Sequence, residues 1–440
     1  MRKDFYRNVL PAMFAFAFSG LYAIVDGWFI GQNVGDLGIA GINLAYPITS
    51  FIQALGTGIG LAGAIQIGIA LGSNDHEDQA RYLKTTVCLL IGASLVAFVL
   101  LVKTYPQILT FFGAQGRLFD YAADYIRIII LFSIFQIMAT GLVPIIRNYG
   151  GTLFAMVAMI TGFITNVILD GYFVSVLKLG TAGAGYATII GQALTMLLCV
   201  GYMFKHVPFG GSEKIKVTLS SVVQVLKVSL SPFGLILSPN LMIIVLNQSA
   251  IQYGGDIAAA SYGVICYVVF SVQLLLQGIG DGCQPLISRY YGNDSMDKVH
   301  EIVSIAIRFA FGVALTCMVI LYSLRFMIPR FFGASEEVAL MIAEVMPLFL
   351  LGLIPIAFLR VSTSYAYATR DNHTAYRPIY SEPILTTILL LWVLPFMLGL
   401  KGVWLSVPLA QYCVLLYSMV VYWKQVNQYK QDFHVESKRI

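Results

Sequence analysis

The sequence predicts an all-α integral membrane protein with twelve transmembrane helices in two pseudo-twofold-related six-helix lobes. Two observations lead to this fold class. First, 58% of the 440 residues are hydrophobic and only 11% are charged, whereas soluble chains carry about 25% charged residues. A soluble protein so poor in charge could not cover its surface, so its solvent must be lipid. Second, the later half of the sequence repeats the earlier half.

Apolar runs long enough to span a bilayer follow one another along the chain. A spanning helix needs about 20 such residues. Twelve runs qualify, centred near residues 20, 58, 97, 135, 164, 192, 236, 271, 314, 354, 389 and 413. The first follows a basic start, "MRKDFYRNVLPAMF", and no small-residue cleavage site ends it. We therefore expect an uncleaved first helix rather than a signal peptide.

The basic residues indicate how the helices are oriented. With the N-terminus inside, 19 of the 27 Lys and Arg residues fall at cytoplasmic ends and seven at outer ends, while Arg360 lies within a span. This bias follows the positive-inside rule. We expect a multi-pass protein of the cell membrane with both termini in the cytoplasm. The loop bias also accounts for the net charge of +5, so no nucleic-acid partner is needed.

Cysteine and histidine positions give no sign of a metal or disulfide framework. All six cysteines lie in apolar runs without CxxC spacing, and the five histidines lie in loops or tails. Such cysteines are typical small buried residues. The sequence therefore predicts neither a metal site nor a disulfide.

A shift of 220 residues aligns the two halves of the chain. "GLYAIVDGWFIGQNVGDLGIAG" (20–41) then lies over "NLMIIVLNQSAIQYGGDIAAAS" (240–261), with seven identities in 22 positions. "FFGA" occurs at both 111–114 and 331–334. Six helices return the chain to its starting side, so both copies have the same orientation. Parallel repeats of this kind are typical of secondary transporters that have a central cavity between their lobes.

The repeat sets the expected domain boundaries. The N-terminal lobe is predicted to cover residues 1–204 and the C-terminal lobe residues 222–440. Between them, "KHVPFGGSEKIKVTLSS" (205–221) is polar, basic and contains glycine. We interpret this segment as a cytoplasmic linker.

One carboxylate interrupts the first apolar run. Asp26 is the only charged residue between Val9 and Gly31, and the repeat places Leu246 at the equivalent position. A carboxylate at membrane depth costs about 2.5–3.5 kcal/mol on insertion scales and indicates a functional site. Because the second copy keeps the scaffold without this charge, we expect Asp26 to serve function rather than folding.

A second polar pair lies in the fifth run, "ITNVILDGYFV". Asn166 and Asp170 are four residues apart and therefore share one helix face. Asp26 and Asp170 both come late in helices that run outward, so both are expected in the outer half of the N-terminal lobe. Two carboxylates in one apolar pocket cannot both ionise at low cost. The pair is predicted to hold a proton, or to share a cation with Asn166; the alternative is that each acid only bonds a neighbouring helix.

The second lobe carries its charges at other positions. Asp281 and Arg360 lie nearer the cytoplasmic ends of their helices. Glu382 precedes Pro383 and is interpreted as an acid at a helix start, where the dipole favours it. Because an unpaired guanidinium within a membrane is costly, we expect either Asp281 or Glu382 to hold Arg360.

Several motifs, in order along the chain, resemble the MATE (multidrug and toxic compound extrusion) transporters. That family's first helix carries a proline, a tyrosine and an aspartate, as Pro11, Tyr22 and Asp26 do in "LPAMFAFAFSGLYAIVDGWFIG". "ITNVILD" fits its N-x-x-x-D motif, and "GTAGAGYATIIGQ" resembles the start of its sixth helix and places Thr188. "IRNYGGTLFAM" and "QPLISRYYGND" are similar to further motifs. The resemblance covers essentially the whole chain.

The resemblance implies a secondary active exporter of bulky amphipathic or cationic molecules, driven by inward flow of H⁺ or Na⁺ through alternating access. It implies no other cofactor and no enzymatic activity. We expect a monomer in contact with membrane lipids, and a bend at Pro11 that lets the first helix reshape its lobe. The expected coupling-ion site comprises Asp26, Asp170, Asn166, Tyr22 and Thr188.

One departure from the family pattern concerns the second lobe. Some members carry extra acids in helices seven and ten for a sodium site, whereas the seventh helix here has no acid and the tenth has Arg360. A cation site of that kind is not expected. Two alternative functions stay open at this point: a lipid-linked oligosaccharide flippase of related fold, and an intramembrane enzyme with Asp26 and Asp170 as an aspartyl dyad.

Overall fold

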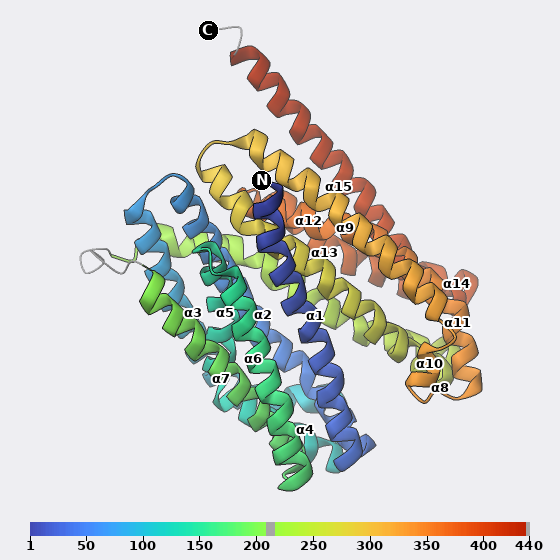
Figure 1. Cartoon of the computed structure of the whole chain (residues 1–440). Helices are drawn as coiled ribbons and strands as arrows, with labels where there is room; N and C mark the ends of the chain where they lie inside the picture. The colour runs from blue at the N-terminus through green and yellow to red at the C-terminus, as the bar shows by residue number, and fades with distance from the viewer. Residues whose placement is uncertain (208–215, 437–440) are drawn as a thin grey trace.

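The computed structural model describes residues 1–207 and 216–436. These residues form long helices that lie side by side (Figure 1), and no strand occurs among them. Much of the predicted linker, residues 208–215, lies outside the described residues. The predicted lobe boundaries therefore stay predictions at that junction.

The helices of the N-terminal lobe follow the six predicted runs. A sharp bend of 61° separates α4 from α5, so that these two helices form one broken span. Asp75 caps α3 by accepting a hydrogen bond from the backbone N–H of Asp78 at 2.9 Å. The elements are α1 (Arg2–Asn33), α2 (Asp36–Gly72), α3 (His76–Phe111), α4 (Arg117–Leu131), α5 (Ser133–Asn148), α6 (Thr152–Asp170), the π-helix η1 (Gly171–Val176) and α7 (Gly180–His206).

The C-terminal lobe begins with a helical segment of 74 residues, α8 (Leu219–Gly292). A single span needs about 20 residues, and this segment is broken at Gly255, where φ is 64°. Glycine permits this left-handed conformation, so α8 holds two successive spans. The later elements are α9 (Met296–Leu324), α10 (Ile328–Phe331), α11 (Glu336–Leu351), α12 (Leu353–Ala368), α13 (Asn372–Ile388), the π-helix η3 (Leu389–Val393), α14 (Leu394–Leu398) and α15 (Leu400–Glu436).

Length and apolar composition show which described helices can cross a membrane. Nine pass that test, or ten when the bent α4–α5 pair counts as one span. The break at Gly255 turns α8 into two spans. The twelfth span is formed by α13, η3 and α14 together, because α13 alone has only 17 residues. The prediction of an all-α membrane protein with twelve spans in two lobes is confirmed for the described part of the chain.

Glycines let the two lobes approach closely. A Cβ on Gly278 of α8 would lie 2.6 Å from the Cα of Met13 in α1. A Cβ on Gly72 of α2 would lie 2.1 Å from the carbonyl oxygen of Arg289 in α8. Larger residues at either position would push the backbones apart. The interface therefore runs mainly between α1 and α2 of one lobe and α8 of the other.

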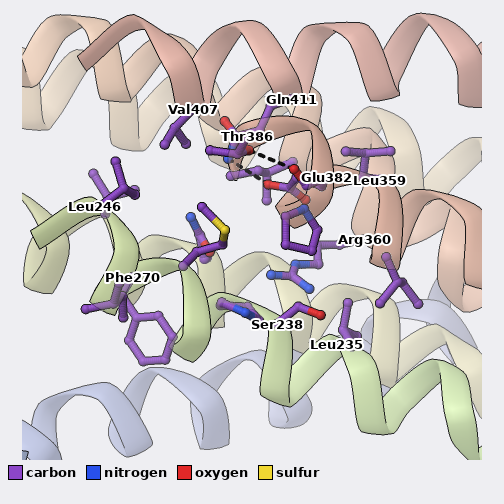
Figure 2. A pocket seen from close by; sticks show the side chains of 18 of the residues that line it. Leu235, Ser238, Leu246, Phe270, Leu359, Arg360, Glu382, Thr386, Val407 and Gln411 are labelled. Atoms are coloured by element: carbon purple, nitrogen blue, oxygen red, sulfur yellow. Dashed lines mark hydrogen bonds between the residues drawn. The ribbon is translucent and has the colours of Figure 1, made fainter. Parts of the chain in front are cut away.

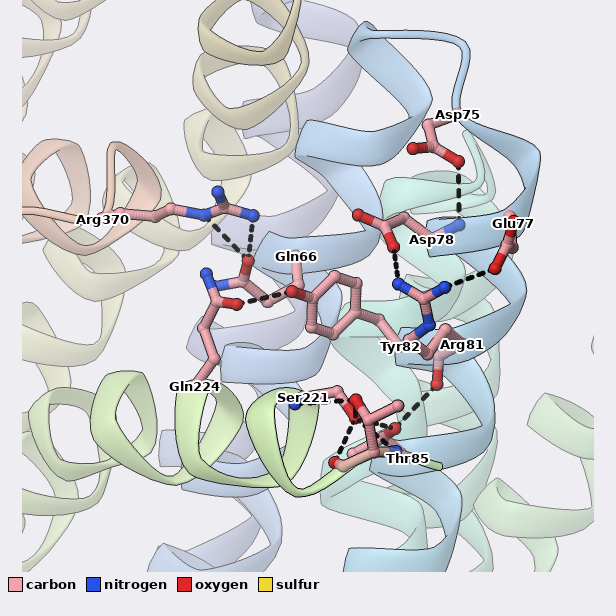
Figure 3. Close-up of polar contacts among 11 residues, drawn as sticks. Gln66, Asp75, Glu77, Asp78, Arg81, Tyr82, Thr85, Ser221, Gln224 and Arg370 are labelled. Atoms are coloured by element: carbon pink, nitrogen blue, oxygen red, sulfur yellow. Dashed lines mark hydrogen bonds and ion pairs between the residues drawn. The ribbon is translucent and has the colours of Figure 1, made fainter. Parts of the chain in front are cut away.

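Polar side chains join the lobes at one end only of the described bundle, next to the turns at 73–75, 149–151, 293–295 and 369–371. Figure 3 shows three of these contacts, made by Gln66, Tyr82 and Thr85 of the N-terminal lobe. By the positive-inside bias, this end is the predicted cytoplasmic end. We name these residues the inter-lobe clamp: Gln66–Arg370, Tyr82–Gln224, Thr85–Ser221 and Asn148–Gln284.

Candidate functional site

Close packing of α6 on α7 sets the frame for the predicted ion site. A Cβ on Gly191 would lie 2.6 Å from the carbonyl oxygen of Gly162 and 3.2 Å from the Cβ of Asn166. Thr195, one turn later in α7, donates a hydrogen bond to the carbonyl of Ala158 at 3.3 Å. Only glycine leaves room for this approach, which presses Asn166 against α7.

The carboxyl groups of Asp26 and Asp170 meet inside the N-terminal lobe. They face each other within hydrogen-bonding reach across the α1–α6 contact. Asp170 has no solvent exposure. The Oδ1 atom of each acid is buried without a hydrogen-bond partner among the described residues. Two such carboxyl groups need a shared proton or a bound cation, because a buried acceptor without a partner and a like-charge pair are both costly.

Asn166 and Thr188 complete a polar cluster around the acids. Both side chains are buried, in α6 and α7 respectively. With the Asn166 amide oxygen accepting from the Thr188 backbone N–H at 3.1 Å, the amide nitrogen donates to Asp170 Oδ2 at 3.3 Å. An amide in this position fixes the orientation of the Asp170 carboxyl group and leaves the Asp26 carboxyl group free to change its orientation.

Two tyrosines line the same region. Tyr22 lies near Asp26 and stacks on Phe163 of α6, with ring centroids 5.0 Å apart. Tyr125, from α4, is buried and shares a hydrogen bond with Thr188. The sequence reasoning missed Tyr125, because it lies on the apolar face of an amphipathic helix, "AADYIRIIIL", where a tyrosine resembles core. Its hydroxyl on that face is the signal that could have identified it.

The backbone next to Asp170 is also unusual. The π-helix η1 begins at the following residue, Gly171, and single-turn π-helices occur frequently at functional sites. Asn33, at the end of α1, donates a hydrogen bond to Ser175 of η1 at 3.0 Å. A shift of α1 relative to α6 would therefore also pull on the turn that follows Asp170.

Pro11 lies within α1, which continues as one helix on both sides of it. It cannot donate a hydrogen bond to the Arg7 carbonyl, so the helix is weakened there. Pro11 precedes Asp26 by 15 residues, about 22 Å along the axis. It is therefore not part of the carboxyl cluster, and its role as a bend stays a prediction.

The three predicted charges of the second lobe lie near enough to act on one another, but no ion pair within 4.0 Å joins them among the described residues. Asp281 accepts hydrogen bonds from Gln277 at 2.6 Å and from the Tyr367 hydroxyl at 3.1 Å. The basic group that acts most strongly on it is Arg147 of α5, a buried residue that the sequence reasoning missed. Arg360 lies instead in a cavity with Glu382, and no carboxylate among the described residues comes within 4.0 Å of its guanidinium.

The interpretation of Glu382 as a residue at a helix start is wrong. α13 begins at Asn372, and Asp371 caps it by accepting from the Thr374 N–H at 3.1 Å. Glu382 lies well inside this helix, where it accepts a hydrogen bond from the Gln411 amide at 3.0 Å. The following proline does not begin a helix here, because a membrane helix tolerates an internal proline.

Replacing Gly191 by leucine is expected to disrupt the carboxyl cluster. The new side chain would meet the Gly162 carbonyl and Asn166, and overpacking of this kind costs about 1–3 kcal/mol. Thermal unfolding of the purified protein should show a lower midpoint, and export should fall. Gly201→Leu is the matched control, because Gly201 lies in the same helix and a Cβ there would meet no neighbouring helix or side chain within 4 Å. Equal effects of the two substitutions would contradict this packing argument.

Known proteins are similar to this chain along most of its length. The MatE family model matches residues 11–171 and 235–377, one stretch in each lobe. "Multidrug export protein MepA" of Staphylococcus haemolyticus (strain JCSC1435) is 25% identical over 418 residues, which cover 94% of this chain and 91% of that protein. The protein of the same name in Staphylococcus aureus (strain MSSA476) is 22% identical, with coverage of 94% and 92%.

Solved structures share the fold. One is described as the "Outward-facing conformation of a multidrug resistance MATE family transporter of the MOP superfamily"; its TM-score is 0.89 at 19% identity, covering 98% of this chain and 96% of that one. A "MOP superfamily transporter from Pyrococcus furiosus Vc1 (DSM3638)" also gives a TM-score of 0.89 at 19% identity, with coverage of 97% and 96%. With the family model matching most of both lobes, the chain belongs to the MatE family of membrane transporters and is not an enzyme.

Proposed function

We propose that this transporter exports many different amphipathic or cationic small molecules, and that H⁺ or Na⁺ entering from outside drives the export. The observation that carries the proposal is the facing pair Asp26 and Asp170, each with a buried Oδ1 atom that has no hydrogen-bond partner among the described residues. Such a pair is stable only when neutralised. The chain aligns along most of its length with proteins named as multidrug exporters, and this similarity supports the proposed class of substrate.

The inter-lobe clamp supports alternating access. Its contacts hold the lobes together at the predicted cytoplasmic end, as an outward-facing transporter requires. In the proposed cycle, a cation from outside neutralises the carboxyl pair, and α1 then repacks against α6. Substrate leaves to the outside, the clamp opens, and the ion is released to the cytoplasm when the lobes part at that end.

The proposed orientation in the cell membrane has both termini in the cytoplasm. The two ends of α3 test it, because Ser73 and Gln115 are both exposed, in the turns before and after that helix. In a cysteine-free background, Ser73→Cys is expected to react with an impermeant maleimide only in everted vesicles. Gln115→Cys should react only in right-side-out cells. Labelling of both cysteines from the same side would contradict the topology.

Transport into everted vesicles, with the pH and Na⁺ gradients imposed separately, tests the function. Because the vesicle lumen represents the outside, a cationic fluorescent dye should accumulate when the lumen is acidic or loaded with Na⁺. Response to one gradient alone identifies the coupling ion. If neither gradient drives dye uptake while a lipid-linked oligosaccharide is translocated, the flippase alternative replaces this proposal.

A further inference from the structure

Arg147 is a buried charge that neither the carboxyl cluster nor the cavity of the C-terminal lobe explains. That cavity has an arginine of its own, Arg360, near Glu382 (Figure 2). Arg147 lies in α5 of the N-terminal lobe and is only 4% exposed. Its guanidinium donates a hydrogen bond to the sulfur of Met159 at 3.5 Å, and its Nε atom has no partner among the described residues. A buried charge with such weak contacts is costly unless an opposite charge compensates it.

The compensating charge belongs to the other lobe. The clamp contact Asn148–Gln284, 3.0 Å long, joins the residue after Arg147 to α8. Asp281 precedes Gln284 by three residues and therefore lies on the same face of α8. Asp281 is the acid that acts most strongly on Arg147, although no ion pair within 4.0 Å joins them among the described residues. Arg147 and Asp281 thus form a charge pair across the boundary between the lobes.

One member of this pair is held firmly and the other loosely. Asp281 accepts hydrogen bonds from Gln277 at 2.6 Å and from the Tyr367 hydroxyl at 3.1 Å, both in its own lobe. Besides the sulfur contact, Arg147 has the ring of Phe16 beneath it, with its Cζ atom 5.6 Å from the ring centroid. This separation suits a cation–π contact. Arg147 is therefore the member of the pair that a movement of α1, which carries Phe16, would displace.

Helix α1 connects the charge pair to the ion site. Phe16 precedes Asp26 by ten residues, which is about 15 Å along the helix axis. The same helix packs on α8 beside Asp281, because a Cβ on Gly282 would lie 2.7 Å from the Cα of Val9. A displacement of α1 at Asp26 would consequently move the Phe16 ring relative to Arg147.

The internal repeat shows that the scaffold does not need this pair. The shift of 220 residues relates Arg147 to Tyr367 and Asp281 to Leu61. The equivalent positions on the other side of the pseudo-twofold axis therefore carry no charge. As for Asp26, a charge that one copy of the repeat omits indicates a role in function rather than in folding.

We propose that Arg147 is a positioning residue of the transport cycle, which transmits the state of α1 to the inter-lobe clamp. While α1 keeps the Phe16 ring on the guanidinium, Arg147 attracts Asp281 across the boundary and the clamp stays closed. When the coupling ion neutralises the carboxyl pair and α1 repacks, the ring leaves the guanidinium. Water then reaches the charges, their attraction weakens, and the clamp opens. This inference rests on the proposed ion-driven cycle.

The opening of the clamp is measured by the reactivity of a cysteine within it. Ser221 is buried in the clamp. In a cysteine-free background, the parent variant Ser221→Cys is expected to react slowly with an impermeant maleimide in everted vesicles. The reaction should become faster when the lumen is acidic or loaded with Na⁺, while the pH of the labelling medium is held constant.

Removing both charges tests the pair. In the parent background, Arg147→Gln combined with Asp281→Asn leaves no uncompensated charge, whereas either change alone leaves one and should lower the midpoint of thermal unfolding. Without a gradient, the double variant is expected to label about tenfold faster than the parent, and a gradient should no longer accelerate it. A pair with a merely structural role would not change the labelling rate. Arg127→Gln combined with Asp124→Asn is the matched control at exposed positions of α4.

Phe16→Leu tests the connection to α1. Without the ring the guanidinium is uncovered, so labelling should again be faster than in the parent and independent of the gradient, and export should fall. Phe14→Leu is the matched control, because Phe14 lies in the same helix and is exposed. It should keep the labelling rates of the parent with and without a gradient.

The double variant and Phe16→Leu each have an outcome that would overturn the proposal. This outcome is the labelling rate of the parent together with an intact response to the gradient. Failure of the proposed function looks different, because neither gradient would then change labelling or dye uptake in the parent. The rates without a gradient still decide the role of Arg147 in that case: faster labelling of the double variant supports it, and the parental rate overturns it.

Discussion

Asp26→Asn is expected to reduce ion-driven export strongly while leaving the protein folded. The amide keeps the size of the side chain but cannot gain and lose a proton or balance a cation. The Asp26–Asp170 pair would then be permanently locked in one charge state. Export in everted vesicles should fall by roughly 10–100-fold, the size of an ordinary coupling between two sites. Thermal unfolding should be close to wild type, because the amide has nearly the same size as the carboxyl group and carries no buried charge.

Asp170→Asn should have the same effect, since it removes the other half of the pair. Asp124→Asn is the matched control: this residue lies in α4 of the same lobe, and its side chain is exposed. Substrate binding to the purified variants separates coupling from recognition. If Asp26→Asn binds substrate and still pumps at the wild-type rate under the same ion gradient, the carboxyl pair is structural and the coupling role is wrong.

Much of this site could be predicted because a charged residue within an apolar run and the spacing of polar residues can be recognised in a single sequence. A carboxylate within an apolar run is costly, and the repeat shows that the scaffold exists without it, since Leu246 stands where Asp26 does in the first copy. The four-residue spacing of Asn166 and Asp170 placed both on one face, and the structure brings that face to Asp26. Charge and periodicity carry this information, and both are local properties of the sequence.

Other parts of the site depend on contacts between distant segments, which no local pattern records. Tyr125 reaches Thr188 only because α4 packs against α7. The π-helix after Asp170 is a local change of hydrogen-bond register with no distinctive composition. Glu382 is interpreted from the sequence as an acid at a helix start because a proline follows it and the helix dipole favours a carboxylate there. Neighbouring helices in a membrane protein can, however, hold a segment with an internal proline helical.

The break in α8 shows the same limit in the fold. The apolar pattern located both spans, but the turn between them is formed at Gly255 with a positive φ and no long polar loop. Conversely, the first half of α13 is rich in polar residues although the helix is part of a span. Two polar residues of α13, Glu382 and Thr386, face the cavity of Arg360 instead of lipid. Polar content within a span therefore indicates what the helix surrounds rather than whether it spans.

Locking the inter-lobe clamp is expected to stop transport completely and reversibly. The Thr85 and Ser221 hydroxyl oxygens are 2.9 Å apart, on α3 of one lobe and α8 of the other. Cysteines at both positions, in a background without the six native cysteines, should form a disulfide under mild oxidation because short side chains in contact suit that geometry. The lobes could then not separate at the predicted cytoplasmic end, and alternating access requires that they do.

Dye uptake by everted vesicles should therefore fall to the level of empty vesicles after oxidation and recover with a reductant. Each single-cysteine variant is the matched control, since it carries the same loss of a hydroxyl but cannot form the bond. Non-reducing electrophoresis after cleavage of the 208–215 segment by an engineered protease site measures how much of the protein is cross-linked. Full transport by fully cross-linked protein would show that the clamp does not open during the cycle, and a different pair of surfaces would have to form the cytoplasmic gate.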